Sequence, residues 1–271
     1  MLARPRYEIL PLTGGVESAL RHAPPEVTLT VTASPRHGID ATLAAVERLA
    51  AEGRSAVPHL SARLVRDAVH LEEILDRLTA IRVRDVFVIA GDVSEPAGAF
   101  AGAADLLRAV GERRRRFDDI GITGYPESHH LIPDETTIAA MNEKAALATY
   151  IVSQVTFDPV VIGTWIERVR ARDTLLPVWV GVPGSVDRRR LLRLSVKMGL
   201  GRSARFLSAH RDWLRRLASS RRYTPTALLD GLAPVLERPA ARVAGLHIYT
   251  FGEVEATERW RRDLLARLSR V

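Results

Sequence analysis

Two acidic side chains at the ends of short apolar runs are the residues best suited to acid–base chemistry. Glu8 lies in the segment Tyr-Glu-Ile-Leu-Pro, and Asp92 follows the run Val-Phe-Val-Ile-Ala-Gly. Each run is typical of a buried strand, and a carboxylate is costly to bury because its charge loses hydration. We therefore predict functional roles for both acids.

Polar side chains also follow most of the other strand-like runs. They are Thr32, His59, Tyr125 with Glu127 and His129, Gln154, and Tyr249 with Thr250. The set contains hydroxyls, imidazoles and an amide, which offers both a donor and acceptors. We expect no metal site, because His59 stands alone and His129 has only the adjacent His130. The sequence also has no Walker loop, no Rossmann glycine fingerprint, no Gly-x-Ser-x-Gly elbow and no cysteine nucleophile.

Each of these residues also has a purely structural interpretation. Glu8 could be exposed on a frayed first strand, and Asp92 could cap the following helix. His59 could donate a hydrogen bond to a buried carbonyl, and Gln154 could serve only to end a strand. The functional interpretation is favoured because all of the residues fall at the same end of their strands.

The elements that must position these side chains alternate between strand and helix. Strand patterns occupy residues 7–10, 27–32, 56–60, 86–90, 120–124, 150–153, 177–181 and 243–249. Helical patterns occupy 39–51, 69–81, 99–112, 135–147, 160–171, a longer basic region at 186–236, and 254–268. This order predicts an α/β fold, a (β/α)8 TIM barrel with extra helices between strands 7 and 8. The alternative is an open doubly wound sheet. We favour the barrel because it gathers all the strand ends around one pocket.

Length, charge and composition limit the class of protein. The 271 residues are expected to form a single domain spanning 1–271. The absence of cysteine and of any apolar run of about 18 residues leads us to expect a cytoplasmic protein without a membrane span. The net charge of +7 comes with scattered arginine clusters. Binding to nucleic acid is one interpretation, and solvated helix faces, which we favour, are the other.

Six segments in the order of the strands resemble the methylenetetrahydrofolate reductase family. They are Tyr-Glu-Ile-Leu-Pro from residue 7, Val-Pro-His-Leu-Ser from residue 57, Gly-Asp from residue 91, Tyr-Pro-Glu-Ser-His from residue 125, Ser-Gln-Val-Thr-Phe-Asp from residue 153, and Gly-Leu-His-Ile-Tyr-Thr from residue 245. The resemblance covers most of the chain and implies a short, divergent member with the catalytic domain only. The family fold, a (β/α)8 barrel, agrees with the fold predicted from the alternation.

The resemblance implies reduction of 5,10-methylenetetrahydrofolate to 5-methyltetrahydrofolate with NADH or NADPH, through FAD. Under this interpretation Glu8 is the general acid, Asp92 stabilises the cation beside pterin and flavin, and Gln154 and Tyr249 contact the substrate. The positions that match FAD contacts are Thr32, His59, Gly91, Asp92, Tyr125, His129 and Lys144. The expected ligand is a folate, with no specific nucleic acid and no membrane, and a homo-oligomer stays open.

Departures from the family pattern fall mainly on the cofactor contacts. Ala90 stands where the family has an arginine, and of the family's polar contacts on the next helix only Lys144 is kept. Three alternatives therefore stay open. Hydride passes through FAD, it passes directly from the nicotinamide to the folate, or the chain is a folate-binding partner subunit without redox activity.

Overall fold

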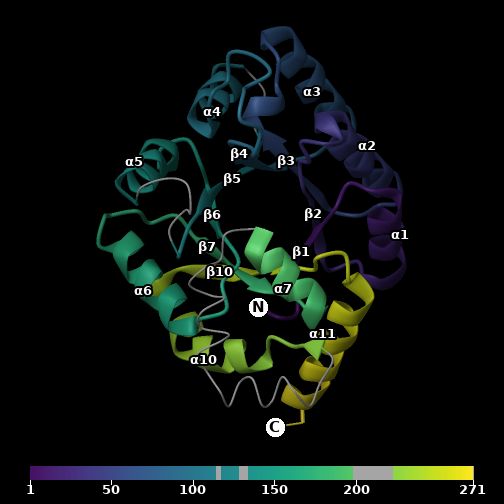
Figure 1. The fold of residues 1–271 in the computed structure, drawn as a ribbon, viewed down its shortest axis with the longest axis vertical. Helices are drawn as coiled ribbons and strands as arrows, with labels where there is room; N and C mark the ends of the chain where they lie inside the picture. The colour runs from purple at the N-terminus through teal and green to yellow at the C-terminus, as the bar shows by residue number, and fades with distance from the viewer. Residues whose placement is uncertain (114–116, 128–133, 198–221, 271) are drawn as a thin grey trace.

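Eight parallel strands close into a barrel in the computed structural model, which describes residues 1–113, 117–127, 134–197 and 222–270 (Figure 1). Around the barrel the order is β1, β10, β7, β6, β5, β4, β3 and β2. The strands are β1 (Arg6–Ile9), β2 (Thr28–Val31), β3 (Ala56–Ser61), β4 (Asp85–Ile89), β5 (Asp119–Gly124), β6 (Tyr150–Ser153), β7 (Val178–Pro183) and β10 (Val243–Tyr249). The predicted TIM barrel is confirmed.

Helices surround the barrel and connect successive strands (Figure 1). They are α1 (Thr13–His22), α2 (Gly38–Ala51), α3 (Ala68–Ala80), α4 (Ala103–Glu112), α5 (Asp134–Ala145), α6 (Pro159–Arg170), α7 (Arg188–Lys197), α10 (Thr226–Leu236) and α11 (Val254–Leu268), with short 3-10 turns η1 (Ala62–Leu64) and η2 (Pro239–Ala241). Helix α1 was not predicted. Its Gly14-Gly15 pair lowers helix propensity, and only Val16 and Ala19 of this helix are buried.

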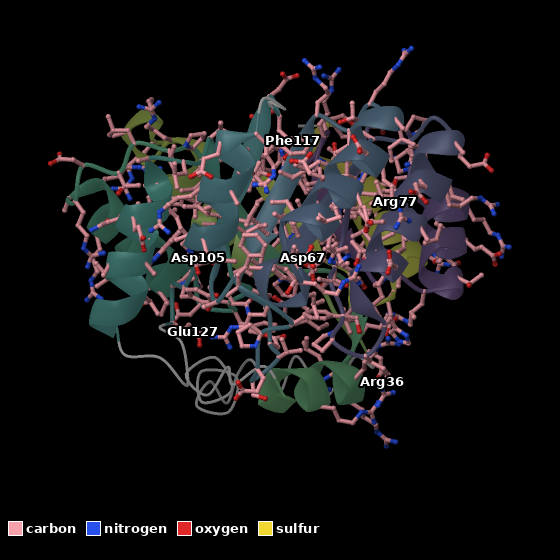
Figure 2. The ribbon with its side chains drawn as sticks, turned by 90° about the horizontal axis from the view of Figure 1, so that it is seen from above. Arg36, Asp67, Arg77, Asp105, Phe117 and Glu127 are labelled. Carbon is pink, nitrogen blue, oxygen red and sulfur yellow. The ribbon has the colours of Figure 1, made fainter. Side chains whose placement is uncertain are left out.

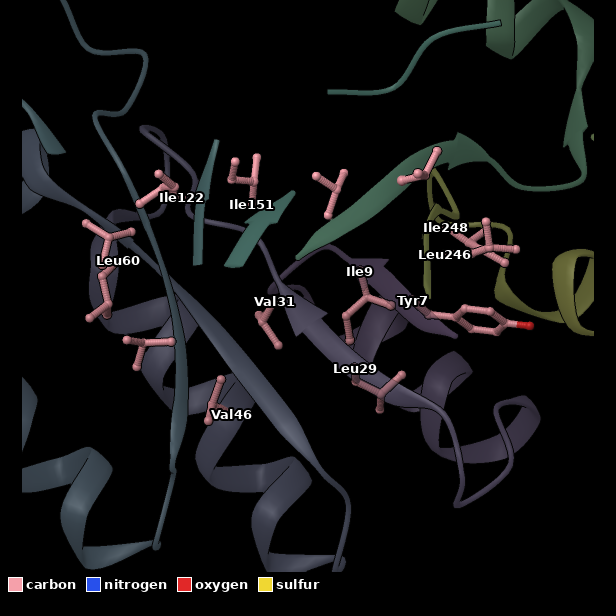
Figure 3. Packing of buried hydrophobic residues seen from close by; sticks show 14 of the residues in the cluster. Tyr7, Ile9, Leu29, Val31, Val46, Leu60, Ile122, Ile151, Leu246 and Ile248 are labelled. Atoms are coloured by element: carbon pink, nitrogen blue, oxygen red, sulfur yellow. The ribbon is translucent and has the colours of Figure 1, made fainter. Parts of the chain in front are cut away.

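The strands bury two faces because successive side chains point to opposite sides of a strand. The outward face packs against the helices and is strongly apolar; Figure 3 shows this layer, which includes Tyr7, Ile9, Leu29, Val31, Leu60, Ile122, Ile151, Leu246 and Ile248. The Tyr7 hydroxyl donates a hydrogen bond to Glu258 on α11 at 2.8 Å. The residues that alternate with this apolar set along each strand face the barrel interior. Many of the polar side chains lie there.

A layer of polar and aromatic side chains fills the barrel interior near the starts of the strands. The Arg6 guanidinium donates to Asp85 at 2.7 Å, and the Tyr150 hydroxyl donates to the other oxygen of Asp85, also at 2.7 Å. Arg6 also lies over the rings of Tyr150 and Trp179, at 4.4 and 4.2 Å from their centroids. We call these four residues the floor layer. They occupy the interior below the level of Glu8.

The segment between β7 and β10 contains the predicted extra helices. Helices α7 and α10 both lie there, which confirms the prediction for the described residues. The helical pattern predicted over 186–236 is interrupted in two places among the described residues. There β8 (Val186–Asp187) and β9 (Arg222–Tyr223) pair as antiparallel strands. Glu253, which follows β10, binds Arg222 at 2.5 Å and accepts a hydrogen bond from the Asp187 backbone at 3.1 Å.

Helix α7 lies at the end of the barrel where the strands finish. Figure 2 places α7, Arg36 and Glu127 on one side of the molecule, and Phe117 on the opposite side. Arg36 follows β2 and Glu127 follows β5, whereas Phe117 precedes β5. The side with α7 is therefore the mouth formed by the carboxyl ends of the strands, where TIM-barrel sites are built.

Part of the basic surface consists of ion pairs along helices. On α11, the exposed Arg259 binds Glu255 at 2.5 Å. On α3, Arg77 binds Glu47 of α2 at 2.8 Å. Among the described residues, no helix is long and apolar enough to cross a membrane.

Candidate active site

Glu8 occupies the barrel interior just above the floor layer. Its side chain points inward from β1 and is 18% exposed. Oxygen Oε2 lies 3.2 Å from Nε2 of His247 and 4.0 Å from Nε2 of His59. Burial raises the pKa of Glu8 to about 7, and the electrostatic interaction with His59 opposes this shift only in part. A carboxyl group with this pKa is a proton donor near neutral pH.

The two histidines beside Glu8 are buried and neutral. Burial lowers the pKa of His59 to about 4 and that of His247 to about 3, and the charge of Arg6 contributes to the shift of His247. The edge of the His59 ring meets Phe87, with centroids 4.7 Å apart. Two histidines and a carboxylate can also bind iron. In the described part of the chain, however, no three His, Cys, Asp or Glu are grouped so that they could hold a metal ion.

Tyr249 ends β10 and is the register partner of Glu8, and Gln154 follows β6, with β7 between these two strands. The Tyr249 hydroxyl donates to the Ser153 carbonyl at 3.2 Å, and burial and the charge of Glu8 raise the pKa of Tyr249. Gly181 makes this approach possible, since a Cβ there would lie 2.1 Å from the Ser153 oxygen and 2.9 Å from the Tyr249 ring. The Gln154 amide oxygen accepts from the Val155 backbone at 3.1 Å. That contact leaves the amide NH2 as the donor group of this side chain.

The prediction that Asp92 is a buried strand-end acid is wrong. Asp92 is exposed, in the loop that follows β4. The chain turns at Gly91, whose φ of +97° suits glycine and where a Cβ would lie 2.0 Å from the Ser61 hydroxyl oxygen. The turn carries Asp92 beyond the strand tip and into water. It remains close enough to Tyr125 for its charge to help raise the pKa of that tyrosine.

The remaining predicted contacts lie on three different elements. Thr32 follows β2, and its hydroxyl is buried without a hydrogen bond among the described residues. Lys144 is buried on α5, and this burial lowers its pKa to about 8. Glu127 accepts a hydrogen bond from the Thr156 hydroxyl, which joins the loops after β5 and β6. His129 lies outside the described residues.

The described residues fit one end of FAD and not the other. Thr32 Oγ1 and His59 Nε2 are buried polar atoms without a hydrogen bond in the described part of the chain, as expected beside a polar flavin ring. The family resemblance places the phosphate end of FAD along α5, where a diphosphate would need cationic partners. Its described side chains from residue 137 onward include two charged groups, Glu143, which is paired with Arg108, and the buried Lys144. A diphosphate is poorly matched by this helix, so the described residues do not form a complete FAD site.

Sequence reasoning missed His247 and the floor layer. Position 247 is two residues before Tyr249 on the same strand, so alternation already directs both side chains inward. That signal was present in the sequence. The contact between His247 and Glu8 was not, because β1 and β10 are joined only when the barrel closes.

The fold and this interior acid define a TIM-barrel protein with its candidate site at the mouth. The family model described as methylenetetrahydrofolate reductase matches residues 16–259, and the chain belongs to this family of oxidoreductases. The match begins after β1, so Glu8 lies outside it.

Two solved structures have the same fold at low sequence identity. A GH18 chitinase from Pseudoalteromonas aurantia is 10% identical with a TM-score of 0.56, covering 96% of this chain and 98% of its own. A protein assigned as a phosphonomutase from Burkholderia cenocepacia J2315 is 14% identical with a TM-score of 0.54, covering 99% of this chain and 94% of its own. At these identities the likeness concerns the fold alone.

Proposed function

We propose that this chain reduces 5,10-methylenetetrahydrofolate to 5-methyltetrahydrofolate, with NADH or NADPH as the reductant. Family membership supports the reaction class. The observation that carries the proposal is Glu8, a largely buried acid whose pKa is raised to about 7 inside the barrel. The reaction requires one proton and one hydride, and Glu8 is suited to deliver the proton.

The proton opens the five-membered ring of the folate. One bond from the methylene carbon to nitrogen breaks, and that nitrogen keeps the electron pair and takes the proton from Glu8. The carbon becomes an iminium ion on the other nitrogen, which is a far better hydride acceptor than the closed ring. Hydride addition then gives the methyl group, and the Glu8 carboxylate recovers a proton from water.

Side chains around Glu8 are assigned to binding and charge stabilisation. The free NH2 of Gln154 would donate to the pterin edge, and the Tyr249 ring would form part of the pterin pocket. Asp92, exposed at the mouth, would stabilise the cation only if the substrate or a loop covers it, because water screens a solvated carboxylate. The order of importance for the chemical step is therefore Glu8 first and Asp92 second.

The described residues favour direct hydride transfer from the nicotinamide to the folate. The family typically uses FAD and NAD(P)H. In this chain α5 offers the diphosphate of FAD only a buried lysine, and Ala90 replaces a family arginine. No step of the proposed reaction is assigned to a flavin.

The deciding experiment combines turnover and binding. Purified protein is mixed with methylenetetrahydrofolate and NADH or NADPH, with and without added FAD, and loss of nicotinamide absorbance is followed. Turnover without flavin supports the proposal. Folate binding by calorimetry without turnover under any of these conditions would instead support a partner subunit without redox activity, the second interpretation left open by the sequence.

A further inference from the structure

We propose that His247 is a positioning residue that directs the acidic proton of Glu8 toward the barrel mouth. This inference rests on the proposed function for its catalytic meaning and on the floor layer for its geometry. Neutral His247 donates from Nε2 to Oε2 of Glu8, so that the proton of the acid resides on Oε1. The positive charge of Arg6 helps to keep this histidine neutral.

The two oxygens of Glu8 have different surroundings. Both histidines approach Oε2, His247 at 3.2 Å and His59 at 4.0 Å. Among the described residues, Oε1 has no hydrogen-bond partner, and it is not one of the buried polar atoms left without one. Oε2 is therefore anchored inside the barrel, and Oε1 is the oxygen that remains accessible.

The donor at the short contact is His247. A neutral imidazole carries its hydrogen on one nitrogen, and the other nitrogen is an acceptor. Nδ1 of His247 is buried and has no hydrogen bond in the described part of the chain. A buried N–H without an acceptor is less favourable than an acceptor left without a donor. The hydrogen therefore belongs on Nε2, where it meets Oε2.

Arg6 helps to keep His247 a neutral donor. Arg6 on β1 is the register partner of His247 on β10, and its positive charge contributes to the lowered pKa of this histidine. A nearby guanidinium disfavours a second proton on the imidazole, so the ring keeps a single N–H. Asp85 at 2.7 Å and the flanking Tyr150 and Trp179 rings fix the guanidinium in place. The floor layer thus fixes the positive charge that keeps His247 neutral.

The hydrogen bond from His247 to Oε2 can form in both protonation states of Glu8. Before proton transfer, Oε2 is the carbonyl oxygen of the acid and accepts from His247, while Oε1 carries the proton. After transfer, Oε2 is part of a carboxylate and accepts the same hydrogen bond more strongly. His247 neither gains nor loses a proton during the cycle. The other titratable groups that face Glu8 are His59 from β3 and Tyr249 from β10.

The tautomer can be tested without any assay of activity. Protein labelled with 15N in histidine gives separate nitrogen signals for the two neutral tautomers, and His247 is assigned by comparison with His247→Gln. We expect a neutral ring with hydrogen on Nε2 near pH 7. Hydrogen on Nδ1, or a charged ring, would overturn the inference even if the protein reduces folate. The expected tautomer in a protein without turnover would leave the geometry intact and refute the proposed function instead.

Catalytic positioning is tested with a pair of variants at position 247. His247→Leu removes the donor at similar volume, and we expect kcat to fall about ten- to a hundredfold. The alkaline limb of the pH profile should move up by about one pH unit, because the lost hydrogen bond had favoured the ionised form of Glu8. His247→Gln offers an amide NH2 at a similar reach, and should return both kcat and the limb most of the way to wild type.

The control is His70→Gln, which replaces a buried histidine on α3 outside the site and should leave kcat and the pH profile unchanged. A fall in kcat for His247→Leu with an unmoved alkaline limb would mean that His247 only fills space, and would overturn the proposal. Unchanged kcat in His247→Leu would also overturn it. If His247→Leu does not fold, the test rests on His247→Gln. A kcat, or an alkaline limb of the pH profile, far from that of wild type in His247→Gln would contradict a role for His247 as a neutral donor.

Discussion

Replacement of Glu8 by glutamine should make the protein more stable at alkaline pH while removing its activity. The pKa of the Glu8 carboxyl is raised from 4.5 to about 7 by burial. Between these values the native state binds more protons than the unfolded state, so the free energy of unfolding falls as pH rises through this window. Glutamine has a similar shape and no charge at any pH. The variant therefore does not lose this part of the free energy of unfolding as pH rises.

The size of the effect follows from the shift in pKa. Each unit is worth about 1.4 kcal/mol, and the shift of Glu8 corresponds to about 3 kcal/mol once the pH is well above 7. The variant should exceed wild type by about 1 kcal/mol near pH 5 and by about 3 kcal/mol near pH 8. Loss of the general acid should lower kcat by about 10² to 10⁴.

Urea unfolding of both proteins across this pH range measures the difference in free energy directly. The buried histidines titrate in both proteins, so their contributions largely cancel in the comparison. Glu17→Gln, at an exposed position on α1, is the control and should change neither stability nor turnover. A stability difference that does not grow with pH would refute the description of Glu8 as a buried neutral acid. Retention of turnover in Glu8→Gln would refute its role as proton donor.

Three further predictions concern the cofactor, the floor layer and the loop after β4. Purified protein should contain well under one flavin per chain, and a yellow preparation with stoichiometric flavin absorbance would contradict the fit of α5 described above. Arg6→Met leaves the Asp85 carboxylate without its cation and should lower the free energy of unfolding by about 3 kcal/mol in urea. Arg84→Met removes an exposed ion pair and is the control for Arg6→Met. An equal loss of unfolding free energy in Arg84→Met would argue against a special role for the floor layer. Gly91→Ala should cost about 1–3 kcal/mol, because φ is +97° and the new Cβ would overlap the Ser61 hydroxyl, so an unchanged Tm would count against this backbone geometry.

Much of the fold was accessible from the sequence because its signals are local. Alternation of apolar strands with amphipathic helices placed all eight barrel strands, and the polar residues after them indicated closure around one pocket. The position of Glu8 inside the barrel follows from the same alternation, since Tyr7 and Ile9 on either side of it face the helices. These inferences need only the period of each segment.

The features that escaped prediction depend on contacts between distant segments. Asp92 was expected to be buried, but the reversal of the chain at Gly91 places it in water, and apolar periodicity does not extend into a loop. The β8–β9 pair joins residues 186–187 to 222–223, and nothing in either dipeptide predicts the other. His247 meets Glu8 across 239 residues of chain, so its part in the site appears only once the barrel is closed.

The floor layer also bears on the route by which Glu8 can be recharged with a proton. Arg6 and Asp85, with the rings of Tyr150 and Trp179, occupy the interior below the acid, where the Arg6 side chain is 9% exposed and that of Asp85 19%, so this end restricts exchange with bulk water. We then expect protons, like substrates, to arrive mainly through the mouth. If a folate is the substrate, a pterin in that entrance would keep the spent carboxylate ionised until the product has left. The barrel would in this way permit a single protonation event for each visit of a folate.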